Sequence, residues 1–271
     1  MELALVLVLG FALGASVASF LNVVADRMPS GQSIVSPPSH CPVCDHELKP
    51  YELVPVFSYV VQGGRCRVCD SRIPMRVPAV EALGGLAFAF VGWRYGITLD
   101  ALLVATMVSF MLVIAIIDLE HKLVLNRVLL VAAPIALASS ALWSEEVRVA
   151  VWDRGGPELA QASDAAAAGL IGVVGLGLFV AVTSLVLGRR SMGMGDVKLL
   201  GVLGLWLGLR GLLVAFYVAA VVGGITAIIL LTLRKFGRKD EIAFAEFLSL
   251  GATVSIVWGE DMLGWYLRVL T

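Results

Sequence analysis

The sequence predicts an all-α polytopic membrane protein with about eight transmembrane helices and a cytoplasmic zinc-binding loop. The 271 residues are 59% hydrophobic and only 15% charged, whereas soluble domains are about 45–50% apolar and about 25% charged. Long uncharged runs follow one another along the chain, and all four cysteines fall in one polar stretch between two of them. The net charge of −1 gives no overall basic field, so we expect the lipid bilayer, and no nucleic acid, as a partner.

Eight segments are candidates for helices that cross the bilayer, which takes about 20 mostly apolar residues. The uncharged runs are 3–25, 101–117, 128–144, 165–188 and 211–233. Three weaker segments are 77–93, which contains Glu81, the short 199–209, and 242–258, which contains Glu246. We therefore expect a first helix within 1–25, a polar loop over 26–76 and a helical core over 77–271.

The basic residues predict the orientation of the chain. With the N-terminus outside and eight crossings, fifteen of the 20 lysines and arginines fall on the cytoplasmic side and five on the outer side, as membrane proteins prefer. The alternative for the first segment is a cleaved signal peptide, because small residues occupy 15–19. A signal peptide needs a positive start, whereas the only early charge is Glu2, so we expect an uncleaved helix.

The four cysteines form two C-x-x-C pairs. Cys41 and Cys44 stand in "CPVC", Cys66 and Cys69 in "CRVC", with 21 residues between the pairs. Two such turns supply the four thiolates of a tetrahedral zinc site, and a site filled by thiolates is structural because no position remains for water. Two disulfides or a redox motif are the alternatives. A reducing cytoplasm disfavours disulfides, and a redox motif needs no second pair.

Two aspartates stand at ends of expected helices on the cytoplasmic side. Asp118 lies in "AIIDLEHKLVLN" and Asp196 in "SMGMGDVKLLG". Two neighbouring carboxyls differ in pKa, so one serves as base and takes a proton from water while the other protonates the scissile carbonyl. Gly193 and Gly195 would let a substrate backbone approach Asp196. The alternatives are a helix N-cap for Asp196 and an ordinary interfacial position for Asp118.

These segments, in this order, resemble the type IV prepilin peptidases, which are membrane aspartic peptidases of the G-x-G-D type that also N-methylate their product. The stretches that carry the resemblance are "GASVASFLNVVADRMP", the cysteine loop with the "VEALGG" that follows it, "IIDLEHKLVLN" and "GMGDVKLLG".

The resemblance implies a bacterial inner-membrane enzyme with Asp118 and Asp196 as its catalytic pair. It also implies that class III leader peptides of type IV pilins or type II secretion pseudopilins are cut at the cytoplasmic face. S-adenosylmethionine would then donate a methyl group to the new N-terminus. The family's isoleucine–proline pair is replaced by Val124 and Leu125 here, which predicts a looser turn after Asp118.

Two other functions remain open at this stage. A proton-coupled transporter could use the two aspartates as relay acids, although it would place acids deep within helices. A membrane scaffold could bind a cytoplasmic partner through the zinc loop, although it gives no reason for the Gly-Met-Gly-Asp segment.

Overall fold

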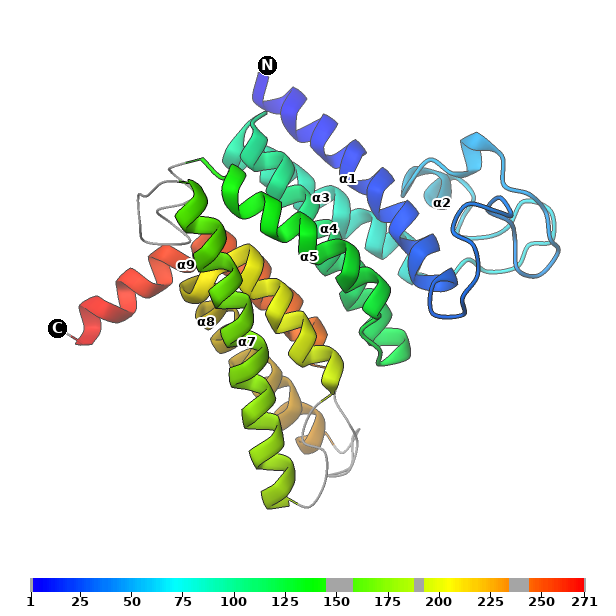
Figure 1. The fold of residues 1–271 in the computed structure, drawn as a ribbon. Helices are drawn as coiled ribbons and strands as arrows, with labels where there is room; N and C mark the ends of the chain where they lie inside the picture. The colour runs from blue at the N-terminus through cyan, green and yellow to red at the C-terminus, as the bar shows by residue number, and fades with distance from the viewer. Residues whose placement is uncertain (1, 145–157, 188–192, 234–243, 271) are drawn as a thin grey trace. The chain divides into compact units, whose positions relative to one another are not determined.

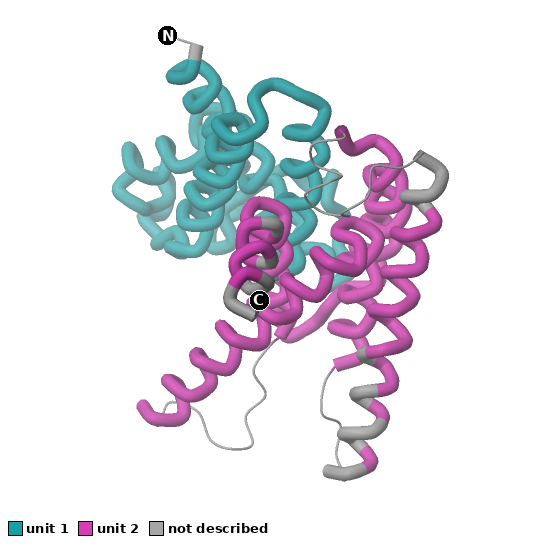
Figure 2. The backbone as a smooth tube through the Cα atoms, turned by 90° about the vertical axis from the view of Figure 1, so that its left-hand side faces the viewer, with its two compact units in different colours: residues 1–116 teal, residues 117–271 magenta. Residues whose placement is uncertain are grey.

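A computed structural model describes residues 2–144, 158–187, 193–233 and 244–270 of the chain. These residues form helices and loops, and no strand occurs among them apart from two isolated bridges in the loop that carries the cysteines. The chain divides into two compact units, residues 1–116 and residues 117–271 (Figure 2).

The first unit is built on a helical hairpin. It contains α1 (Glu2–Arg27), a long loop with the short helices η1 (Pro50–Glu52) and α2 (Phe57–Val61), α3 (Arg76–Tyr95), and α4 (Leu99–His121) as far as Ile116. Helices α1 and α3 pack along their length, and the loop projects from one end of the pair (Figure 1). The polar loop expected over 26–76 therefore connects two packed helices.

Small residues allow α1 and α3 to approach closely. A Cβ atom on Gly14 would collide with the carbonyl oxygen of Gly84, and one on Gly10 would lie 3.0 Å from Ala89 Cα. Lipid offers no hydrophobic drive for helix association, so such close packing of small residues is how membrane helices hold together. Arg76 closes the loop end of this pair by an ion pair of 2.7 Å with Asp26.

The second unit groups α5 (Asn126–Leu142), α7 (Glu158–Leu187) and α9 (Ala245–Leu270) around α8 (Met194–Thr232). Helix α8 is interrupted at Gly208, whose φ of 63° and ψ of −177° are non-helical and suit glycine. The expected segments 199–209 and 211–233 are thus the two arms of α8. The first arm begins at Met194, five residues earlier than its apolar run.

The first arm of α8 forms the centre of this unit. Trp206, Leu199, Leu203 and Leu207 are fully buried. Packing against α7 is close, because a Cβ on Gly204 would lie 2.6 Å from the carbonyl oxygen of Ala168. On the other side, Ser255 of α9 donates a hydrogen bond of 2.8 Å to the Gly211 carbonyl at the start of the second arm.

The all-helical prediction is confirmed for the described residues. Three of their helices are long and apolar enough to cross a membrane, Leu3–Arg27, Leu99–His121 and Met194–Thr232, and α5, α7 and α9 contain shorter apolar stretches. The basic residues at 148, 154, 189–190 and 234–239, which contribute to the expected orientation, lie outside the described part of the chain.

Candidate active site and candidate metal centre

The four cysteine sulfurs of the first unit meet at one point. Their Sγ atoms all lie within 4.8 Å of one another, and no disulfide joins them. Cys41 Sγ is 3.7 Å from Cys69 Sγ, and Cys44 Sγ is 4.0 Å from Cys66 Sγ. A tetrahedral zinc ion with Zn–S bonds of about 2.3 Å sets its sulfurs roughly 3.8 Å apart. The cluster therefore has the composition and size of a Cys₄ zinc site.

The two cysteine pairs are held by matching turns. In the first, the Cys41 N–H donates to the His46 carbonyl and the Asp45 N–H donates to the Cys41 carbonyl. In the second, the Cys66 N–H donates to the Ser71 carbonyl and the Asp70 N–H donates to the Cys66 carbonyl. Asp45 and Asp70 both have left-handed φ angles, 56° and 59°, which aspartate tolerates better than most residues. The sequence thus folds into two similar cysteine turns whose sulfurs lie together.

The surroundings of the cluster shift the pKa values of Cys41, Cys44 and Cys69 in different directions. The Ser71 hydroxyl, 3.5 Å from Cys41 Sγ and 3.1 Å from Cys69 Sγ, lowers the pKa of both thiols, that of Cys41 to about 6. The His46 N–H lowers the pKa of Cys44, but burial and the neighbouring sulfurs raise it to about 12. Four thiolates in one place repel each other, and a bound dication would offset that repulsion.

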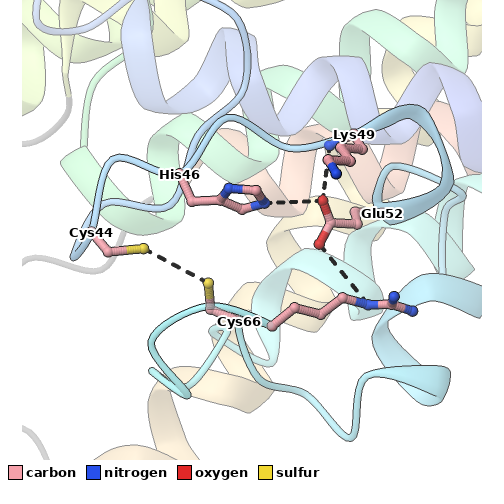
Figure 3. A network of polar contacts seen from close by, with 6 residues as sticks. Cys44, His46, Lys49, Glu52 and Cys66 are labelled. Carbon is pink, nitrogen blue, oxygen red and sulfur yellow. Dashed lines mark hydrogen bonds and ion pairs between the residues drawn. The ribbon is translucent and has the colours of Figure 1, made fainter.

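Glu52 connects the two turns, a role that the sequence does not reveal. Its side chain is 1% exposed and accepts a hydrogen bond of 2.9 Å from the Lys49 N–H. His46 Nε2 lies 3.2 Å from the carboxylate on one side and Arg67 Nε lies 4.0 Å away on the other (Figure 3). The Lys49 N–H, His46 and Arg67 lower the pKa of Glu52. Because His46 follows Cys44 and Arg67 follows Cys66, this carboxylate braces both halves of the cluster.

Asp118 lies near the end of α4, within the second unit. The residue is 4% exposed, and its carboxyl group accepts hydrogen bonds from the backbone N–H groups of Ala245 and Glu246 at the start of α9. Its Oδ2 atom is buried and has no hydrogen-bond partner among the described residues. A buried polar atom without a partner is costly, so Oδ2 calls for a hydrogen-bond partner that the described residues do not supply.

Asp196 occupies the first turn of α8. It is 9% exposed, and the backbone N–H of Gly193 donates to its carboxyl group. Gly193 is the N-cap residue of α8, so Asp196 stands three residues inside the helix, and the N-cap role considered for it from the sequence is wrong. Asp118 lies close enough for its charge to act on Asp196. The two acids, 78 positions apart in the sequence, therefore lie within electrostatic reach of each other in one unit.

The turn after Asp118 contacts α8 at two points. Lys198 Nζ donates a hydrogen bond of 2.9 Å to Asn126 Oδ1, and Val124 packs against Gly195. The looser turn that the missing proline predicts is accordingly fixed on α8 by these two contacts.

The two glycines before Asp196 have different surroundings. A Cβ on Gly195 would lie 2.8 Å from Val124 Cβ, so the chain itself fills the space that this glycine provides. A Cβ on Gly193 would lie 3.4 Å from Asp196 Oδ2 and near only one other atom. Of the two positions expected to admit a substrate backbone, Gly193 is the less crowded among the described residues, and its nearest neighbour is the carboxylate of Asp196.

Sequence reasoning predicted the helix over 242–258 but assigned no role to its start, which is the start of α9. Glu246, which had no expected role, is half-buried beside Asp118, and its charge and that of Asp118 interact. The signal that could have found it is an acid opening an apolar helix on the side of the membrane where both aspartates are expected. Glu81, also without an expected role, is buried in α3 and accepts a hydrogen bond of 2.7 Å from the Val56 N–H in the first unit.

Comparison with known proteins places this chain of apolar helices among the membrane-bound leader peptidases. Residues 12–95 match the bacterial peptidase A24 N-terminal domain, and residues 105–228 match the type IV leader peptidase family. The chain belongs to this family.

Curated relatives cover nearly the whole chain. The prepilin leader peptidase/N-methyltransferase of Bacillus subtilis strain 168 is 28% identical over 259 residues, 96% of this chain and 97% of the relative. The protein of the same name from Pseudomonas aeruginosa PAO1 is 30% identical over 279 residues, 94% of this chain and 91% of the relative. No solved structure matches the chain.

Proposed function

We propose that this protein is a prepilin leader peptidase that cuts leader peptides at the cytoplasmic membrane face with Asp118 and Asp196. The observation that carries the proposal is the meeting of these two buried acids, from α4 and α8, within electrostatic reach of each other. Paired carboxylates hydrolyse peptide bonds without a covalent intermediate, because one can hold a proton while the other is ionised.

The surroundings of the two aspartates suggest which of them is the base and which is the acid. Asp118 faces two N–H groups at the N-terminus of α9, where the helix dipole favours a negative charge. Its Oδ2 has no partner and could accept a proton from a bound water. Asp196 receives a single N–H, from Gly193. We assign Asp118 as the base that activates water and Asp196 as the acid that protonates the scissile carbonyl.

The substrate assignment rests on the relatives. Several are named prepilin leader peptidase/N-methyltransferase, so pilin or pseudopilin precursors are the substrates we propose. Gly193 lies beside the Asp196 carboxylate with few other described atoms near it, so a substrate backbone could pass there. Gly195 would contribute indirectly by letting α8 approach Val124.

Two cofactors belong to the proposal. One zinc ion would be held by Cys41, Cys44, Cys66 and Cys69, whose spacing supports a structural role. Methyl transfer from S-adenosylmethionine to the new N-terminus is supported by the relatives' names, and no residue is assigned to the methyl donor.

The membrane arrangement we propose has eight crossings in the bacterial inner membrane, with the N-terminus outside. The two arms of α8 would be separate crossings that meet at Gly208. The excess of lysine and arginine on the proposed cytoplasmic side, fifteen against five, supports this orientation.

A mass-spectrometric assay tests both activities. Purified protein in detergent is incubated with a prepilin that carries its leader, with and without S-adenosylmethionine. We expect loss of the leader mass in both cases and an added methyl group only with S-adenosylmethionine. An intact prepilin after incubation with folded, zinc-loaded protein would contradict the proposal.

A further inference from the structure

We propose that α2 and the residues just before it form a membrane-surface anchor that holds the zinc loop against the lipid. This inference rests on the proposed topology, in which α1 and α3 cross the bilayer. It concerns an apolar surface, made of Leu53, Val54, Phe57, Val60 and Val61, which we call the α2 face.

The side chains of the α2 face are exposed and lie close together in the sequence. Its five side chains are 42–70% exposed. Phe57, Val60 and Val61 recur at i, i+3 and i+4 and so share one side of α2, and Leu53 and Val54 stand in the turn just before it. Five exposed large apolar side chains within nine residues of a polar loop are unusual in water and indicate an interaction site. The zinc cluster and the Glu52 network account for the buried residues of this loop but leave the α2 face uncovered.

The depth of α2 indicates what covers it. The ion pair between Asp26 and Arg76 joins the loop ends of α1 and α3, and charged groups belong at the membrane surface or outside it. The Val56 N–H, at the start of α2, donates to Glu81, which stands five residues beyond Arg76. At 1.5 Å per residue this is about 7 Å along α3. The start of α2 therefore lies below the level of the ion pair, at the depth of the upper acyl chains.

The length of α3 agrees with this depth. Its 20 residues span about 30 Å, which is the thickness of the hydrocarbon core, so Arg76 stands at one edge of the core. Amphipathic helices bind the interface with their apolar side about 5–10 Å into the boundary between headgroups and acyl chains. α2 is a single short turn without charged residues, but the α2 face has the apolar character and the depth of such a segment.

The backbone at Val56 indicates that the position of α2 against α3 is fixed by the fold. Val56 has a φ of 62°, which is a rare and strained conformation for a β-branched residue. Its N–H is held by the buried carboxylate of Glu81 at 2.7 Å. A strained turn fixed to a membrane helix keeps α2 at a set depth, and with it the metal-binding loop.

Depth-dependent quenching tests the anchor in the full-length protein. A small fluorescent amino acid replaces Val60, or Phe57 as a second probe, and the protein is reconstituted in nanodiscs of phosphatidylethanolamine and phosphatidylglycerol. Val68, at the tip of the second cysteine turn, is a matched control because it is a valine of similar exposure, 63% against 70%. Leu13, on the exposed side of α1, reports whether α1 lies in lipid.

We expect nitroxide lipids to quench the probes at 57 and 60 at least threefold more strongly than the probe at 68, and aqueous iodide to show the opposite order. Equal iodide quenching at 60 and 68, with strong lipid quenching at 13, would overturn the anchor while leaving the topology intact. Absence of lipid quenching at 13 would overturn both the topology and the anchor. Retention of zinc by each labelled protein shows that the loop has folded.

Discussion

Lys198 of α8 donates a hydrogen bond of 2.9 Å to the side chain of Asn126, the first residue of α5. Lys198 stands two residues after Asp196, and Asn126 follows Asp118 by eight residues. The bond therefore joins the two segments that carry the proposed catalytic acids, and it fixes the turn after α4 on α8.

Removal of this bond should lower activity without loss of the fold. A hydrogen bond to a charged group contributes about 1.5–3 kcal/mol when well placed, less when exposed, so we expect Lys198→Met to lower kcat/KM about tenfold at constant zinc content. Lys198→Gln, which keeps a donor, should recover part of the loss. Equal kcat/KM for Lys198→Met and wild type would show that the bond does not position the acids.

Gly195 should be intolerant of a side chain because of Val124. Gly195→Ala places a Cβ 2.8 Å from Val124 Cβ, which pushes α8 away from the turn after Asp118, so we expect a fall in kcat of at least tenfold. The double variant Gly195→Ala/Val124→Gly removes the clash and should restore activity in the same cleavage assay. Failure of this rescue would indicate that Gly195 contacts the substrate directly.

Zinc should be bound at one ion per chain and released when a ligand is lost. Cys41→Ser and Cys69→Ser should each reduce the metal content measured by elemental mass spectrometry from one ion per chain toward zero, since structural zinc sites need all four ligands. Limited proteolysis should then cut within the loop, whereas Ser39→Ala, outside the cluster, should leave both metal content and cleavage pattern unchanged. Full zinc occupancy in both cysteine variants would contradict the proposed site.

Glu52 should stabilise the loop in a pH-dependent way. Its pKa is lowered in the folded protein, chiefly by the Lys49 N–H, so its contribution is fully present above the ordinary value of 4.5 and is lost as the pH falls below that value. Glu52→Gln should speed hydrogen exchange at the Lys49 amide at pH 7, by about tenfold for a loss near 1.4 kcal/mol. Glu47→Gln, at an exposed residue of the same loop, is the control.

The difference in the hydrogen-exchange rate of the Lys49 amide between Glu52→Gln and wild type should become smaller below pH 4.5. A difference that stays constant through that range would show that the ionised carboxylate is not what holds the two cysteine turns together.

The sequence was sufficient for features that depend on local pattern. Apolar runs predicted the helices, since any helix in lipid must satisfy its own backbone and present apolar side chains. Two C-x-x-C pairs predicted a four-sulfur cluster because the spacing itself defines the turn. The acids Asp118 and Asp196 were expected to approach one another, and the charge of Asp118 does act on Asp196. Their common side of the membrane stays a prediction.

Other features depend on contacts between distant residues, which composition does not encode. Glu52 appears in sequence as an ordinary loop acid, yet it is buried between His46 and Arg67. Gly195 appears as an opening for substrate, yet Val124 fills its space. The contact between Asp118 and the start of α9 was missed because its donors are backbone N–H groups. The residue types in the sequence do not reveal such donors.

The most direct test of the central claim is the prepilin cleavage assay with Asp118→Asn and Asp196→Asn beside wild type. Asparagine keeps the shape of each side chain and removes its ability to exchange a proton. We predict that each variant loses at least 10³-fold in kcat, in the range that removal of a proton-transferring group produces, while it keeps its zinc and its thermal stability. Cleavage at near wild-type rate by either folded variant would contradict the two-aspartate mechanism.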